Sequence, residues 1–123
     1  MGQRGARKTE KELTDLEGLE SCLNASNTAP VVIFKHSTSC SISAGAYENV
    51  RQFLSQPPNA CPEFYMVKVI ESRPVSNEIA SRLGVQHRSP QIILVKDGQP
   101  LWSASHYGIN VDAISGALKM ERG

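Results

Sequence analysis

Short apolar runs alternate along this chain with longer stripes of helical spacing, and this alternation limits the fold more than any other feature. Three strand-length runs rich in β-branched residues span residues 31–34, 64–70 and 91–95. The stripe after the first run consists of Ile42, Ala46, Tyr47, Val50, Phe53 and Leu54. Strands that alternate with helices predict parallel β–α–β connections and helices on the faces of one sheet.

Punctuating residues divide the first half of the chain into elements. Thr14 and Glu17 have the capping-box spacing, so we expect Thr14 to be the N-cap of a first helix at about 15–25. Pro57-Pro58 ends the helix that follows the first strand, and Gly84 ends a third helix that opens at residues 74–76.

The second half adds a hairpin and a last helix. Asp97-Gly98 predicts a two-residue turn, after which residues 99–105 return as an antiparallel strand. Asn110 is the expected N-cap of the last helix. The residues expected to face inward from this helix are Val111, Ile114, Leu118 and Met120.

These elements predict an α/β fold, a three-layer α/β/α sandwich with a central mixed sheet of four or five strands. A fifth strand would lie at about 11–13. The length of 123 residues suits a single domain, which we place at 10–123. Residues 1–9 are basic and contain no core-forming residue, so a disordered tail is expected there, with a binding arm as the alternative.

Composition excludes several classes of function. The net charge of +1 gives no electrostatic reason to expect nucleic acid or a membrane as a partner, and the apolar runs are too short to cross a bilayer. The N-terminal segment lacks the apolar stretch of a secretory signal. The odd number of cysteines, three, fits a reducing compartment, and we expect a cytoplasmic protein. The spacing of His36, His87 and His106 matches no zinc pattern, so no metal is expected.

The polar segment after the first strand is the best candidate for a site, because sites in α/β sheets form at the carboxyl ends of parallel strands. Cys40 lies in this segment, directly before a helix, where backbone N–H groups and the helix dipole favour a thiolate. We therefore expect Cys40 to be a nucleophile. The alternative is a small buried side chain.

Ser43 occupies the position three residues after Cys40, where a dithiol site would carry its second cysteine. A hydroxyl cannot close an internal disulfide, so a second molecule or a distant cysteine must resolve a mixed disulfide on Cys40. Ser43 either donates a hydrogen bond to the thiolate or caps the helix. Cys22 is expected in the core, and Cys61 is either an incidental loop cysteine or a resolving thiol.

Two further segments are expected near Cys40. Pro90 precedes the third strand, and a cis bond there would expose the backbone of Ser89 for pairing with an extended thiol ligand, although the residues alone do not assign the isomer. His106 and Tyr107 follow the last strand at the same edge. They either line a thiol-binding surface or form a solvated loop.

Two stretches resemble motifs of the monothiol bacilliredoxins, which are thioredoxin-like proteins of the bacillithiol system. The first resembles the family's redox motif and reads Phe34-Lys35-His36-Ser37-Thr38-Ser39-Cys40-Ser41-Ile42-Ser43. The second, residues 85–92, is similar to the family's cis-proline segment, and Ser105-His106 also fits. The resemblance covers about residues 13–118.

The resemblance implies a thioredoxin fold in which Cys40 takes bacillithiol from a modified protein thiol. It also implies that Pro90 is cis and that Ser89 shapes the ligand groove. In this interpretation Cys40 and Ser43 are catalytic, and the residues that bind the thiol are Thr38, Ser39, Ser41, Ser89, Pro90 and His106. The family usually carries proline directly after the cysteine, where this chain has Ser41.

The expected function is therefore that of a monothiol thiol–disulfide oxidoreductase acting on S-thiolated proteins. No tightly bound cofactor is expected, and a low-molecular-weight thiol, bacillithiol or an equivalent, is the expected co-substrate. The alternative is a non-enzymatic thioredoxin-fold module that binds a partner or senses redox state.

Overall fold

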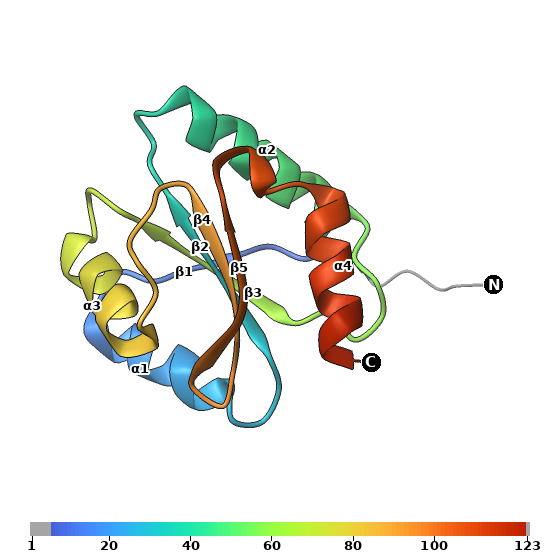
Figure 1. Cartoon of the computed structure of the whole chain (residues 1–123), viewed down its shortest axis with the longest axis horizontal. Helices are drawn as coiled ribbons and strands as arrows, with labels where there is room; N and C mark the ends of the chain where they lie inside the picture. The colour runs from blue at the N-terminus through green and yellow to red at the C-terminus, as the bar shows by residue number, and fades with distance from the viewer. Residues whose placement is uncertain (1–5, 123) are drawn as a thin grey trace.

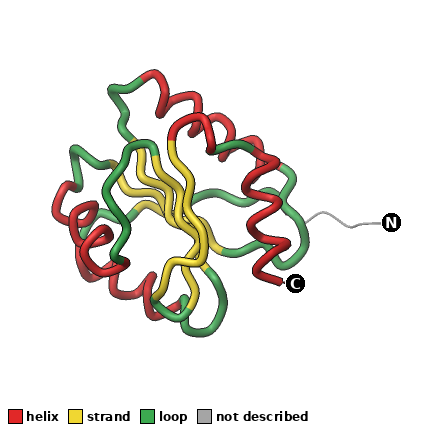
Figure 2. Tube along the Cα trace, in the orientation of Figure 1, coloured by secondary structure: helices red, strands yellow, loops and turns green. Residues whose placement is uncertain are grey.

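The sheet at the centre of the computed structural model, which describes residues 6–122, has five strands in the order β1-β3-β2-β4-β5 (Figures 1 and 2). The strands are β1 Lys11–Glu12, β2 Val31–His36, β3 Glu63–Lys68, β4 Gln91–Lys96 and β5 Gln99–Ser105. β1 and β2 run parallel to β3, whereas β4 is antiparallel to both β2 and β5. The predicted mixed sheet is thus confirmed with five strands.

Helices cover both faces of this sheet (Figure 1). They are α1 Leu16–Ala25, α2 Ser41–Ser55, α3 Arg73–Leu83 and α4 Val111–Arg122, with a short 3₁₀ turn, η1 His106–Gly108, before α4. The cores behind the two faces are separate. One joins α2 and α4 to the sheet, and the other joins α1 and α3 to it. This is the expected three-layer sandwich.

β2 is buried along its whole length and supplies both cores by alternation. Val32 and Phe34 face α2 and α4, while Val31 and Ile33 face α1 and α3. The same period of two directs Lys35 toward the α1 and α3 face, although a lysine is rare in such a position. Because β2 is held on both faces, the position of the segment that follows its carboxyl end is fixed.

Two of the predicted turn signals have the expected geometry. Asp97 and Gly98 both have positive φ, at 54° and 71°, as the predicted hairpin turn requires. Asn110 Oδ1 accepts a hydrogen bond of 2.9 Å from the Ala113 N–H, so Asn110 is the N-cap of α4.

Two sequence predictions about helices were wrong. Asp15, not Thr14, is the N-cap of α1, because Asp15 Oδ1 accepts from the Gly18 N–H at 2.7 Å. Both residue types cap well, and the helix begins one residue later than the capping-box spacing indicates. Met120 is 79% exposed rather than inward-facing, because two residues beyond the buried Leu118 the helix has turned more than halfway around its axis.

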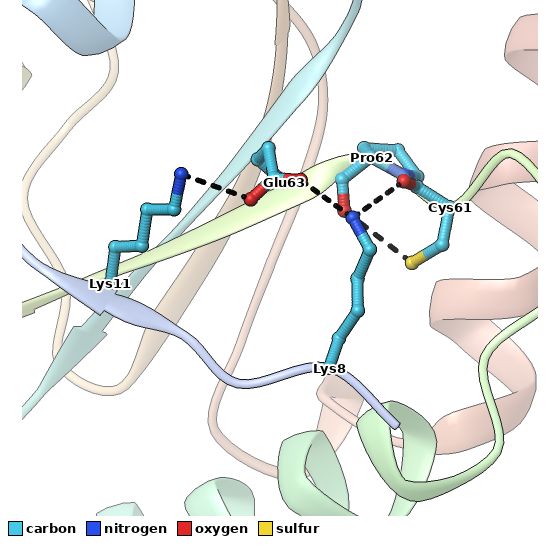
Figure 3. A network of polar contacts seen from close by, with 5 residues as sticks. All are labelled: Lys8, Lys11, Cys61, Pro62 and Glu63. Carbon is cyan, nitrogen blue, oxygen red and sulfur yellow. Dashed lines mark hydrogen bonds and ion pairs between the residues drawn. The ribbon is translucent and has the colours of Figure 1, made fainter. Parts of the chain in front are cut away.

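The first five residues of the expected N-terminal tail lie outside the described residues. Within the described part, Lys8 contacts the domain (Figure 3). Its backbone N–H donates to Leu54 O at 2.9 Å, and its ammonium donates to Cys61 O at 3.1 Å and to Glu63 Oε2 at 2.7 Å. Contacts with the folded core therefore begin before the predicted boundary at residue 10, and the division into tail and domain stays a prediction.

Candidate active site

The edge of the sheet where β2 ends brings together three segments that are far apart in the sequence. In the strand register, Lys35 of β2 lies opposite Gln91 of β4, which in turn lies opposite Ser105 of β5. Three segments therefore meet at this edge: the one that follows β2, the one before β4 and the one after β5. The His106 N–H donates to Pro90 O at 3.1 Å and joins the last two segments directly.

Cys40 is the N-cap residue of α2 and is half-buried. Its backbone is tied down on both sides, since its N–H donates to Ser37 O at 3.3 Å and its carbonyl accepts from the Ala44 N–H at 3.0 Å. Its side chain makes no capping hydrogen bond. The Cys40 side chain is thus placed at the N-terminal end of α2, as the sequence predicts, and its role as a nucleophile stays a prediction.

Ser43 braces the segment before Cys40. Its fully buried Oγ accepts a hydrogen bond of 2.9 Å from the Ser37 N–H and lies 2.8 Å from His36 Nδ1. Within the part of the chain that the structure describes, this hydroxyl makes no hydrogen bond to Cys40. These contacts favour a bracing role for Ser43, and its catalytic role stays a prediction.

His36 connects the Ser43 hydrogen bond to the aromatic side chains of the core. Its ring lies 4.8 Å from that of Tyr47 and 5.6 Å from that of Phe34, measured between ring centroids. Burial lowers the pKa of His36, although the charge of Glu71 opposes the shift. A neutral imidazole can accept the Ser43 hydroxyl hydrogen at Nδ1.

The predicted thiol-binding residues next to Cys40 point in different directions. The Thr38 hydroxyl donates to Glu71 Oε2 at 3.2 Å, toward the loop after β3. Ser39 Oγ lies 3.4 Å from Ser37 Oγ and remains exposed. Ser41 is exposed on the opposite side, toward η1.

A groove of about 540 Å³ lies between α2 and η1, and both Ser41 and His106 line it. The space beside Gly45, which also lines the groove, is open, since a Cβ at this position would meet no atom within 4 Å. Tyr107, at the other side of the groove, is 82% exposed. His106 has a positive φ of 54°, a strained value for a residue with a side chain.

The peptide bond between Ser89 and Pro90 is cis, as the resemblance implies. Pro90 is buried, and the buried Ser89 Oγ has no hydrogen-bond partner among the described residues. Gln91, the next residue, donates from Nε2 to Gln86 O at 3.1 Å and thereby closes the turn.

Sequence reasoning missed the contact between the buried Lys35 and the exposed His87. Lys35 Nζ lies 3.0 Å from His87 Nδ1, and Lys35 is completely buried. Burial lowers the pKa of Lys35 to about 8. The pKa of His87 is also lowered, first by burial and then by the charges of Lys35 and Arg73. A lysine at the end of an otherwise apolar strand was the available signal.

The other two cysteines are removed from this edge. Cys22 is fully buried in α1, and burial raises its pKa to about 12. Cys61 precedes β3 at the opposite edge, where its Sγ contacts Pro62 O at 3.4 Å (Figure 3) and burial raises its pKa to about 11. All three cysteines are free. The length of β2 separates Cys40 from Cys61 by roughly 20 Å, which exceeds the ~7 Å limit between disulfide-bonded Cα atoms.

The described residues contain neither a cluster of metal-ligating side chains nor a helix that could span a membrane. No three His, Cys, Asp or Glu side chains come together there as candidate metal ligands. None of the described helices is long and apolar enough to cross a membrane.

The sequence matches the model of a known protein family. The family model described as "Monothiol bacilliredoxin BrxC" matches residues 11–114, which include the segment around Cys40 and the Ser89–Pro90 bond. The chain belongs to the monothiol bacilliredoxin family. The sequence resemblance is thus confirmed over most of the chain.

Solved structures confirm the thioredoxin fold of this bacilliredoxin. A candidate oxidoreductase with a thioredoxin fold superposes with a TM-score of 0.77 at 29% identity, covering 89% of this chain and 93% of that one. Thioredoxin from Malassezia sympodialis gives 0.76 at 15% identity, with coverage of 97% and 96%. Mitochondrial thioredoxin 3 from Saccharomyces cerevisiae gives 0.67 at 19% identity, with coverage of 90% and 94%. The family and the first of these structures support a thiol redox function.

Proposed function

We propose that this protein is a monothiol thiol–disulfide oxidoreductase that removes a low-molecular-weight thiol, bacillithiol or an equivalent, from protein mixed disulfides. The observation that carries the proposal is the placement of Cys40. It alone among the three cysteines is both partly exposed and placed at the start of a helix. The other two are held protonated at neutral pH by burial, with pKa values of about 12 and 11.

The first step is thiol–disulfide exchange. The Cys40 thiolate attacks the sulfur of the small thiol in the protein mixed disulfide, so that one S–S bond breaks and a new one forms to Cys40. The protein thiolate leaves and takes a proton from water. No oxidant or reductant is consumed in this step, because one disulfide is exchanged for another.

The second step regenerates the enzyme. Ser43 has no thiol, and Cys61 lies at the far edge of the sheet, so the adduct on Cys40 must wait for an external thiolate. A second low-molecular-weight thiol attacks the sulfur bound to Cys40. The products are the symmetrical small disulfide and the free Cys40 thiolate. This thiol is therefore the co-substrate and the reductant of the cycle.

The surroundings of Cys40 suit an extended disulfide substrate. The backbone of Ser89 lies beside the buried cis-Pro90, and the groove lined by Ser41 and His106 opens on the other side. Ser41 retains a backbone N–H at the first position of α2, where the family's usual proline has none. This adds one donor beside the thiolate.

The test is removal of bacillithiol from an S-bacillithiolated protein, followed by intact-mass spectrometry of both proteins. The wild type should release the modified protein's thiol and gain one bacillithiol. The Cys61→Ser variant should behave in the same way, and the Cys40→Ser variant should do neither. Activity in Cys40→Ser would refute the mechanism. Adduct formation on Cys40 without turnover by added thiol would favour the alternative, a redox-sensing module.

A further inference from the structure

The Ser43 hydroxyl, in the first turn of α2, is shared between two partners. Its Oγ accepts a hydrogen bond of 2.9 Å from the Ser37 N–H and lies 2.8 Å from His36 Nδ1. A hydroxyl carries a single hydrogen, which it can donate only once. The direction of the contact with His36 therefore decides whether Ser43 has a hydrogen left for another acceptor.

One direction of this contact satisfies the buried groups better than the other. Ser43 and His36 are both buried, and the two contacts above are the hydrogen bonds of this hydroxyl within the part of the chain that the structure describes. If His36 donated from Nδ1, the Ser43 hydrogen would be buried without an acceptor, which is unfavourable. Ser43 is therefore the donor, and the neutral imidazole carries its own hydrogen on Nε2.

The surroundings of His36 favour this neutral imidazole. Burial is the largest influence and lowers the pKa of His36 from its ordinary value of 6.5. The charges of Glu71 and Glu10 raise it and that of Lys68 lowers it, so that they partly cancel. His36 is thus uncharged at neutral pH and can accept the Ser43 hydrogen.

Cys40 is a competing acceptor for the same hydrogen. Cys40 is the N-cap of α2, and Ser43 is the third residue of that helix. Side chains at these two positions are neighbours, since an N-cap side chain reaches the backbone N–H of the third helical residue. The Cys40 side chain nevertheless makes no capping hydrogen bond, and the Ser43 hydrogen is used by His36.

We propose that His36 is a positioning residue that keeps the Ser43 hydrogen away from the Cys40 thiolate. Ser43 then braces the Ser37 N–H without stabilising the thiolate. Because the intrinsic nucleophilicity of a thiolate falls as the thiolate is stabilised, this arrangement favours attack on a mixed disulfide. The inference rests on the proposed function and goes beyond it, since it adds His36 to the residues that set the reactivity of Cys40.

The experiment measures the rate at which iodoacetamide alkylates Cys40 between pH 5 and pH 10, read from the peptide that contains this residue. His36→Phe keeps a ring against Phe34 and Tyr47 but removes the acceptor, which releases the Ser43 hydrogen to Cys40. The midpoint of the pH–rate profile should then fall by about one pH unit, as expected for a hydrogen bond to a charged group.

A second substitution separates this role from general damage to the site. Ser43→Ala alone should leave the midpoint unchanged, whereas Ser43→Ala added to His36→Phe should restore the wild-type midpoint. A purely structural role of His36 would not produce this coupling. His87→Phe is the matched control and should not move the midpoint, because His87 contacts Lys35, which faces the α1 and α3 side of the sheet.

A further measurement requires no substitution. The ¹⁵N chemical shifts of the His36 ring at pH 7 should place its hydrogen on Nε2 in the wild-type protein. A hydrogen on Nδ1, an unchanged midpoint in His36→Phe or a raised midpoint in Ser43→Ala alone would overturn the role of His36 and leave the proposed function standing. Failure of iodoacetamide to alkylate Cys40 at any pH in this range would overturn the proposed function as well.

Discussion

Replacement of Lys35 by methionine should make the protein more stable at neutral pH. Lys35 is buried in β2 with a histidine as its partner, and burial lowers its pKa from 10.5 to about 8. Below pH 8 the folded protein must hold a desolvated ammonium, whereas the unfolded chain holds a solvated one. Methionine fills a similar volume without a charge.

The sign and size of the effect follow from proton linkage. Between pH 8 and 10.5 the unfolded chain binds the Lys35 proton more tightly than the folded protein does, so wild-type stability rises with pH in this window. The full difference between the folded and unfolded pKa of Lys35 corresponds to about 3 kcal/mol of unfolding free energy. The wild type gains about 1 kcal/mol of this between pH 7 and pH 9. The raised pKa values of Cys22 and Cys61 act in the opposite direction above pH 9, but they are shared by both proteins and cancel in the difference.

The assay is guanidinium unfolding at pH 7, 8, 9 and 10, followed by far-UV circular dichroism. The advantage of Lys35→Met over the wild type should be largest at pH 7 and should shrink steadily toward pH 10. Lys119→Met, which removes an exposed lysine of α4, is the control and should show no such trend. A constant difference between Lys35→Met and wild type across this range would refute the reasoning.

Three other outcomes are expected. Sub-stoichiometric iodoacetamide at neutral pH should label Cys40 first, since the other two thiols are kept protonated by burial; peptide mapping would contradict this if another cysteine led. Asp15→Ala should cost about 1 kcal/mol of unfolding free energy and Thr14→Ala almost nothing. A larger loss in Thr14→Ala than in Asp15→Ala would exclude Asp15 as the cap. Ser43→Ala should cost about 1 kcal/mol of unfolding free energy because the partly buried Ser37 N–H loses its acceptor, and an unchanged denaturation midpoint would show that Ser43 does not brace the loop.

Periodicity and turn chemistry predict most of this fold because they are local properties. The two-residue hairpin at Asp97-Gly98, the Asn110 cap and the placement of Cys40 at the start of α2 all depend on residues close in sequence. The cap of α1 was misplaced by one residue because Thr14 and Asp15 are adjacent and chemically equivalent caps.

The contacts that shape the site are not local, and the sequence did not predict them. Lys35 meets His87 across 52 residues, in a turn whose course follows no periodic pattern. Ser43 contacts His36 because the loop between β2 and α2 is tight. The spacing of three residues from Cys40 indicated only that the Ser43 side chain would lie near the start of the helix. Chain order therefore placed the candidate nucleophile Cys40 at the start of α2, whereas the contacts around it required the tertiary structure.

The central claim is that Cys40 works without a partner cysteine in the same chain. Non-reducing peptide mapping by mass spectrometry, after incubation with the symmetrical disulfide of bacillithiol, tests it most directly. The account predicts a single bacillithiol on the peptide that contains Cys40, with Cys22 and Cys61 unmodified and unbridged. A disulfide between Cys40 and either of the other cysteines within one folded chain would contradict it.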